Sequence, residues 1–135
     1  MSKKINTILL VDDDIAINFF HKRLFTKLDI VKDVVSVYNG CEAVKNIELL
    51  NNSLTKDDIV LIFLDLNMPV MDGWEFLDNF KNISNHLCYS VEIFILSSSM
   101  NPDDIEKAKN NILVSNYFPK PLAINNVTVL LEHYF

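Results

Sequence analysis

Glycine and proline are scarce in this sequence, which has only two glycines and four prolines among its 135 residues. This composition excludes collagen-like and linker-like chains, which are rich in both residues. Half of the residues are hydrophobic, so the chain can bury enough apolar surface to fold. The length suits one domain with one core, and we expect a single domain over residues 1–135.

Long hydrophobic runs and an excess of basic charge are also missing. No apolar run approaches the ~20 residues of a membrane span, and the run at residues 8–11 is too short for a signal peptide. The formal net charge of −6 opposes a nucleic-acid partner, which requires a basic face. We therefore expect a cytoplasmic protein that binds neither membranes nor nucleic acids.

Cysteine and histidine offer no recognisable metal-ligand pattern. Cys41 and Cys88 form neither a C-x-x-C pair nor any other metal spacing, so we expect reduced, structural thiols. The three histidines have no cysteine or carboxylate at metal-ligand spacing. We interpret His21, His86 and His133 as ordinary surface or boundary residues.

Five short apolar runs alternate with five segments of helical periodicity. The runs predict strands at residues 7–11, 34–37, 59–64, 91–96 and 116–118. The intervening segments carry apolar stripes of helical spacing: Ile17, Phe20, Leu24 and Leu28; Ala43, Val44, Ile47 and Leu50; Phe76, Leu77, Phe80 and Ile83; Ile105, Ala108 and Ile112; and Val127, Leu130, Leu131 and Tyr134. The alternation predicts an α/β fold, a doubly wound five-stranded parallel sheet of flavodoxin-like order 2-1-3-4-5 with helices on both faces.

Polar side chains follow the predicted strands at the points where the strands end. Asp12 and Asp13 follow the first strand, Asp65 the third, Ser97 the fourth and Lys120 the fifth. In an open parallel sheet these ends share one edge, which is where ligands bind. The sequence therefore predicts a site of three carboxylates, one hydroxyl and one ammonium.

The chemistry of this set favours phosphoryl transfer with Mg²⁺ as the cofactor. Neighbouring carboxylates repel, and a hard divalent cation with oxygen ligands removes the conflict. A carboxylate can also be a nucleophile that forms an aspartyl-phosphate. The transferred group needs its oxygens neutralised, which Mg²⁺, Lys120 and the Ser97 hydroxyl would supply, leaving Asp65 as the acceptor.

On these strand-end segments the sequence resembles the receiver domain of two-component response regulators, in its stand-alone, chemotaxis-regulator-like form. The segments are Val11-Asp12-Asp13, residues 64–73, Leu96-Ser97-Ser98 and Lys120-Pro121, and the resemblance covers essentially the whole chain. It implies phosphorelay signalling, in which a histidine kinase or histidine phosphotransfer protein donates the phosphoryl group. It also implies no attached output domain, and no catalysis beyond the chain's own phosphorylation and dephosphorylation.

The resemblance implies a role for each matching residue. Asp65 is the phosphorylated aspartate, and the expected Mg²⁺ ligands are Asp12, Asp13, Asp65 and the main-chain carbonyl of Asn67. Ser97 is the switch hydroxyl and Tyr117 the switch aromatic, while Lys120 pairs with the phosphate. The Lys120–Pro121 peptide bond is expected to be cis. The output is a change in binding, to a target protein or in a homodimer, at the face of the fourth helix, fifth strand and last helix.

Other functions fit the same fold less well. A phosphatase of the haloacid dehalogenase type requires a second acid two residues after the nucleophile, and this chain has Asn67 at that position. A flavin-binding relative needs a phosphate loop after the first strand, where three aspartates would repel the phosphate. A pseudo-receiver that binds partners without phosphorylation stays open, although the intact site residues oppose it. Individually, Tyr117 also fits a half-buried strand aromatic, and Ser97 an ordinary loop residue.

Overall fold

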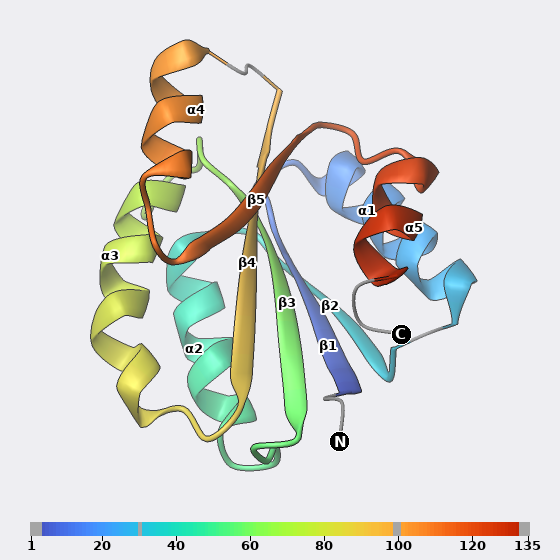
Figure 1. Ribbon diagram of the computed structural model, residues 1–135, viewed down its shortest axis with the longest axis vertical. Coiled ribbons are helices and arrows are strands. Elements are labelled where there is room, and N and C mark those ends of the chain that lie inside the picture. The colour runs from blue at the N-terminus through green and yellow to red at the C-terminus, as the bar shows by residue number, and fades with distance from the viewer. Residues whose placement is uncertain (1–3, 30, 99–100, 133–135) are drawn as a thin grey trace.

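The computed structural model describes residues 4–29, 31–98 and 101–132, and its centre is a parallel sheet of five strands (Figure 1). The strands are β1 (Lys4–Val11), β2 (Asp33–Val37), β3 (Asp58–Asp65), β4 (Ser90–Ser97) and β5 (Val114–Pro119). Their order across the sheet is β2-β1-β3-β4-β5, and every pair is parallel. The predicted strand order is therefore confirmed.

Helices cover both faces of the sheet. They are α1 (Ile15–Leu28), α2 (Gly40–Leu50), α3 (Gly73–Ile83), α4 (Pro102–Lys109) and α5 (Ile124–Glu132), with a short 3-10 turn at Ser84–His86. Figure 1 shows α1 and α5 on one face, and α2, α3 and α4 on the other. The doubly wound architecture is confirmed. No helix within the described residues is long and apolar enough to cross a membrane.

The middle strand β3 is buried on both faces, which is why it reads as a continuous apolar run. Ile62 belongs to the core under α2, α3 and α4, whereas its neighbour Phe63 belongs to the core under α1 and α5. The ring of Phe63 lies 5.1 Å from that of Phe25 on α1 and 5.2 Å from that of Phe94 on β4. Burying each such ring stabilises the fold by about 2 kcal/mol, so the strand that carries Asp65 is firmly anchored.

The loop after β3 turns sharply back toward the sheet. The Gly73 amide donates to the Leu66 carbonyl at 2.9 Å, and a Cβ at Gly73 would lie 2.7 Å from the Asp65 carbonyl oxygen. Only glycine permits that approach. Within the loop, the exposed Val70 has a left-handed backbone (φ 69°), which is costly for a β-branched residue.

Side-chain caps begin four helices close to the strand ends, and the cap of α2 is Asn39, which accepts from the Glu42 amide. The Asp14 side chain accepts from the Ile17 amide at the start of α1. Asp72 forms a capping box with Glu75 at the start of α3. Asn101 caps α4, with Pro102 in the first turn. These caps satisfy backbone amides that would otherwise lack partners, and they fix where each loop ends.

The buried face of α1 differs from the predicted one. Phe20 was expected inside but is 49% exposed, and the buried positions are Asn18, His21 and Phe25. His21 is only 1% exposed, so its interpretation as a surface or boundary residue was wrong. The reason is that backbone groups outside α1 form hydrogen bonds with Asn18 and His21. These bonds offset the cost of burying the two polar side chains.

The helix α4 ends at Lys109, with Asn110 as its C-cap, so Ile112 lies beyond it and is 95% exposed rather than on its buried face. His86 is exposed, and both cysteines are free thiols, as predicted. The predicted roles of His133 and Tyr134 fall outside the described residues.

Candidate functional site

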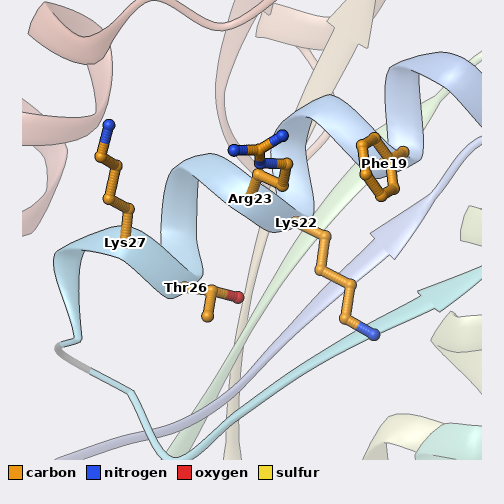
Figure 2. Close-up of a pocket in the computed structure, with 5 residues that line it drawn as sticks. All are labelled: Phe19, Lys22, Arg23, Thr26 and Lys27. Atoms are coloured by element: carbon orange, nitrogen blue, oxygen red, sulfur yellow. The ribbon is translucent and has the colours of Figure 1, made fainter.

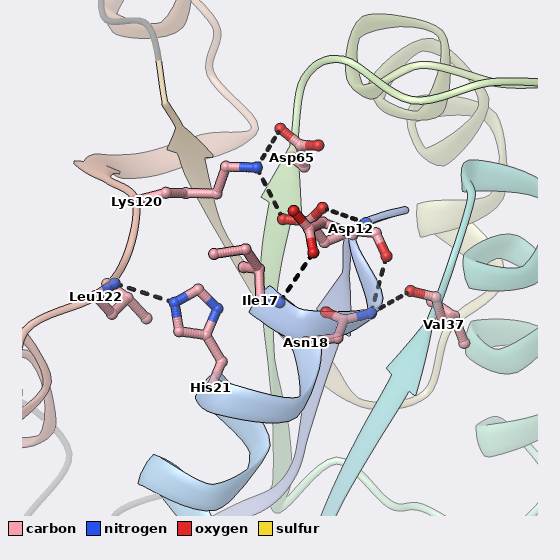
Figure 3. Close-up of polar contacts among 9 residues, drawn as sticks. Asp12, Ile17, Asn18, His21, Val37, Asp65, Lys120 and Leu122 are labelled. Atoms are coloured by element: carbon pink, nitrogen blue, oxygen red, sulfur yellow. Dashed lines mark hydrogen bonds and ion pairs between the residues drawn. The ribbon is translucent and has the colours of Figure 1, made fainter.

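The ammonium group of Lys120 joins the ends of two central strands (Figure 3). Its Nζ atom lies 3.0 Å from Asp12 Oδ2 and 3.3 Å from Asp65 Oδ1. Asp12 follows β1, Asp65 ends β3, and Lys120 follows β5, so the contacts bring three separate strand ends together. Both carboxylates are almost fully buried, at 2% and 4% exposure. The predicted gathering of these three residues at one edge is confirmed.

Asp12 is held in place by its own loop and by α1. Its Oδ1 atom accepts a hydrogen bond from the Asp14 amide at 2.9 Å. The Asn18 side-chain amide donates to the Asp12 carbonyl at 2.9 Å and to the Val37 carbonyl at 3.0 Å. One buried amide thus fastens the ends of β1 and β2 to α1 (Figure 3). This leaves Asp12 little freedom to move away from Asp65.

Asp13 completes a group of three carboxylates. Asp12, Asp13 and Asp65 each offer an oxygen atom, and these atoms lie within 4.8 Å of one another. Asp13 is exposed, so it opens the group to solvent on one side. Asn67 lies two residues beyond Asp65 and is exposed. Its backbone amide donates to the Asp65 carboxylate. Clustered hard oxygen donors with an open side fit a cation such as Mg²⁺.

The pKa values of Asp65 and Lys120 are both raised, so the site favours protonation or the binding of a cation. Burial raises the pKa of Asp65 to about 6, the Asp12 carboxylate adds to that rise, and Lys120 and the Asn67 amide oppose it. Burial alone would lower the pKa of Lys120, but its contacts with Asp12 and Asp65 raise it overall. The ammonium therefore stays charged near neutral pH, while the surroundings of Asp65 disfavour its ionised form. A bound cation would stabilise that ionised form.

Ser97 and Tyr117 lie together beside α4. Ser97 is buried at the end of β4, and its carbonyl accepts from the Lys120 amide at 3.0 Å. Ser97, Tyr117, Ile105 and Ala108 help to line an apolar cavity of about 10 Å³. Such a space holds one water molecule at most. Tyr117 is half-buried there, so any larger movement of its ring into this space requires α4 to move as well.

Sequence reasoning missed the two buried polar residues of α1. Asn18 and His21 stand three positions apart, so they share one face of the helix. The His21 Nε2 atom accepts from the Leu122 amide at 3.0 Å, and burial lowers the pKa of His21 to about 4. Their spacing was the one available signal, and the polar residue types masked it. Figure 3 shows both side chains pointing toward the loops that carry Asp12 and Lys120.

Comparison with known proteins identifies the family. The response regulator receiver domain, as a family model, matches residues 8–132 of this chain. The chain belongs to this family. Receiver domains are signalling modules of two-component phosphorelays rather than a family of enzymes, and they work with histidine kinases or phosphotransfer proteins. The resemblance that the sequence motifs indicated is therefore confirmed.

Relatives and solved structures agree with the assignment. This receiver domain is 27% identical over 128 residues to the probable methanogenesis regulatory protein FilR2 of Methanothrix harundinacea (strain 6Ac), covering 93% of this chain and 78% of that protein. It is 26% identical over 127 residues to sporulation initiation phosphotransferase F of Bacillus subtilis (strain 168), covering 94% and 91%. A two-component response regulator from Cytophaga hutchinsonii has a TM-score of 0.79 and 30% identity, with 98% of both chains covered. A receiver protein from Dyadobacter fermentans DSM 18053 has a TM-score of 0.81 and 25% identity, with 96% and 97% covered.

The receiver domain also has a pocket along α1, lined by side chains of that helix (Figure 2). Its volume is about 510 Å³, and its lining is aromatic and basic: Phe19, Lys22, Arg23, Thr26 and Lys27. The Arg23 guanidinium lies 5.9 Å from the centre of the Phe19 ring. None of these lining residues belongs to the group of three carboxylates, so the pocket is separate from the acidic site.

Proposed function

We propose that Asp65 of this receiver domain accepts a phosphoryl group from a phosphohistidine of a histidine kinase or histidine phosphotransfer protein. The observation that carries the proposal is the position of Lys120 Nζ between Asp12 and Asp65 at the carboxyl edge of the sheet. In the reaction, an Asp65 oxygen bonds to phosphorus while the bond from phosphorus to the donor nitrogen breaks. The electron pair stays on the imidazole, which then takes up a proton.

The acidic group would hold one Mg²⁺ ion. Its ligands are the carboxylates of Asp12, Asp13 and Asp65 and the main-chain carbonyl of Asn67. Support comes from the 4.8 Å grouping of the three carboxylates and from the raised pKa of Asp65, which a nearby cation would lower. When bound, Mg²⁺ supplies positive charge to the phosphoryl oxygens, which is the main requirement of this chemistry.

Lys120 would change partners after transfer. In the unmodified protein its ammonium pairs with both Asp12 and Asp65. A phosphoryl group on Asp65 brings more negative charge and more acceptor oxygens, so the ammonium turns to it. The Ser97 hydroxyl then moves toward the same oxygens, and Tyr117 follows into the space vacated. Because the cavity beside Ser97 is only about 10 Å³, this step displaces α4.

The signal would leave through the face formed by α4, β5 and α5. The helix α4 carries exposed acids that precede its exposed lysines along the chain: Asp103, Glu106, Lys107 and Lys109. Charges of both signs in a fixed order discriminate between partners. A displaced α4 presents them differently, so a target protein or a second copy of this chain binds with altered affinity.

The decisive experiment is incubation with acetyl phosphate and Mg²⁺, followed by intact mass measurement. Wild-type protein should gain one phosphoryl mass, and Asp65→Asn should gain none. Asp78→Asn, which alters an exposed carboxylate on α3, is the matched control and should be phosphorylated like wild type. No added mass from acetyl phosphate or from a phosphorylated kinase would refute the proposal and favour the pseudo-receiver.

A further inference from the structure

The loop that carries Lys120 is fastened to the rest of the fold at two backbone amides. The Lys120 amide donates to the Ser97 carbonyl at 3.0 Å. Pro121 has no N–H, so the next available donor is Leu122, whose amide donates to His21 Nε2 at 3.0 Å. Leu122 is only 2% exposed, so its amide cannot turn to bulk water instead. The backbone that carries the Lys120 side chain is therefore held by one hydrogen bond at Lys120 itself and by a second one two residues later.

The imidazole of His21 is suited to this contact. It is buried at 1% exposure, and accepting at Nε2 requires a neutral ring with its proton on Nδ1. The bond joins residues 101 positions apart, so nothing in the local sequence produces it. An apolar residue of similar size would fill the same space in the core, but it would leave the Leu122 amide buried without an acceptor.

His21 also shares its helix face with the residue that fixes Asp12. Asn18, one turn earlier, donates to the Asp12 carbonyl at 2.9 Å. The inner face of α1 thus binds two segments from positions three apart. Asn18 binds the segment that carries Asp12, and His21 binds the segment that carries Lys120 (Figure 3). Lys120 Nζ and Asp12 Oδ2, which lie 3.0 Å apart, thus belong to two segments that are each hydrogen-bonded to this helix face.

We infer that His21 is a positioning residue, which sets the place of the Lys120 ammonium by accepting the Leu122 amide. The inference rests on the proposed function in that Lys120 is taken as the group that pairs with the phosphoryl oxygens. Without the His21 anchor, the segment from Lys120 to Leu122 is held on one side only. The ammonium then meets the phosphoryl group less often in the productive place.

The first test reads the response to beryllofluoride, a phosphoryl mimic, from the Tyr117 amide signal in NMR spectra with Mg²⁺. His21→Leu fills the space but cannot accept, and we expect its apparent affinity for beryllofluoride to fall about fivefold, the effect of one lost hydrogen bond. His21→Gln can accept through Oε1 and should stay within about twofold of wild type. Phe25→Leu, which alters a buried residue one turn further on the same face, is the control for lost stability and should respond like wild type.

A double-mutant comparison separates positioning from a general structural role. If His21 acts through the ammonium, His21→Leu should cause no further loss in a Lys120→Ala background. An equal loss in both backgrounds, or a His21→Gln protein as weak as His21→Leu, would overturn the inference.

The second test uses the unmodified protein and does not depend on phosphoryl chemistry. A hydrogen-bond scalar coupling should connect the Leu122 amide nitrogen and His21 Nε2 in the wild type. The Cε–Hε signal of Lys120 should shift in His21→Leu and return in His21→Gln. Absence of the coupling, or a Lys120 signal unmoved in His21→Leu, would refute positioning even if Asp65 is phosphorylated. If the coupling and the Lys120 shift are both present but the protein does not respond to beryllofluoride, the proposed function alone is refuted.

Discussion

The ammonium of Lys107 lies 4.4 Å from the centre of the Trp74 ring, a cation–π contact that joins α4 to the first turn of α3. Trp74 is the only tryptophan of the chain, so tryptophan fluorescence reports on the surroundings of this one ring, of which Lys107 is a part. If phosphorylation displaces α4, the ring loses or changes its cationic neighbour. The fluorescence of one residue thus measures the movement that the proposed switch requires.

We predict that beryllofluoride with Mg²⁺ changes the intensity of Trp74 emission in the wild type. Lys107→Met removes the cation and should reduce that change by more than half, because the ring no longer has a charged neighbour to lose. Lys109→Met, on the same helix, is the control and should behave like wild type. A full-sized change in Lys107→Met would mean that the signal arises from the metal site and not from α4.

Removal of the ammonium should destabilise the metal-free protein. Lys120→Ala leaves the buried Asp12 and Asp65 without a positive partner, and we predict a loss of about 3 kcal/mol in the free energy of unfolding in EDTA. Mg²⁺ supplies the missing charge, so it should restore most of the loss. Urea unfolding with and without Mg²⁺ measures both values, and Lys45→Ala on the exposed side of α2 is the control. The same loss in EDTA and in Mg²⁺ would show that Lys120 stabilises the fold by packing alone.

His21 gives the stability a pH dependence of known sign. Burial is the main cause that lowers its pKa from 6.5 to about 4, while Asp12 opposes the shift and Lys120 adds to it. The unfolded chain therefore binds this proton at higher pH than the folded one. The contribution of neutral His21 is complete above about pH 6.5 and is lost as pH falls toward 4, by about 3 kcal/mol in all.

Asp65 has the opposite sign, because its pKa is raised to about 6 and the folded chain protonates first. The measurement is therefore made in an Asp65→Asn background in EDTA, with and without His21→Gln. The difference in unfolding free energy between these two proteins should change by about 3 kcal/mol between about pH 7 and pH 4, to the disadvantage of the protein that keeps His21 at low pH. A difference that is independent of pH would show that His21 does not titrate in this range.

Val70 offers a test of backbone strain beside the site. Its left-handed conformation is costly for valine, and its side chain is 77% exposed, so little packing is at stake. Val70→Gly should raise the free energy of unfolding by about 0.5 to 1 kcal/mol. Val129→Gly, at an exposed position within α5, should lower it by about 1 kcal/mol, since glycine weakens a helix. Loss of stability in both variants would argue that the Val70 side chain makes contacts that matter.

The acidic site could be predicted from the sequence because its residues follow strands. Strand ends are visible as the point where an apolar run stops, and parallel strands place those ends at one edge. Asp12, Asp65 and Lys120 needed only this rule to be brought together. The cis Lys120–Pro121 bond was expected from the family resemblance and is confirmed.

The inner face of α1 could not be predicted in the same way. Hydrophobicity ranks Phe20 above His21, so a periodic pattern places the wrong residue inside. The partners that make Asn18 and His21 stable in the core are backbone groups of Val37, at the end of β2, and of Leu122, in the loop after β5. A pattern within one helix contains no information about them. The early end of α4 escaped notice for a related reason, because Ile112 continues the apolar spacing after the helix has stopped.

The contact between Lys120 and Asp12 spans 108 positions, and β5, which precedes Lys120, lies at the edge of the sheet and, within the described residues, pairs with β4 alone. During synthesis all five strands emerge before Lys120 does, so Asp12 and Asp65 have no ammonium partner until the segment after β5 has been made. A nascent or partly unfolded chain that lacks β5 has the proposed acceptor Asp65 but not the ammonium. Under the proposed function, such a chain could not respond to phosphorylation until the last strand has formed.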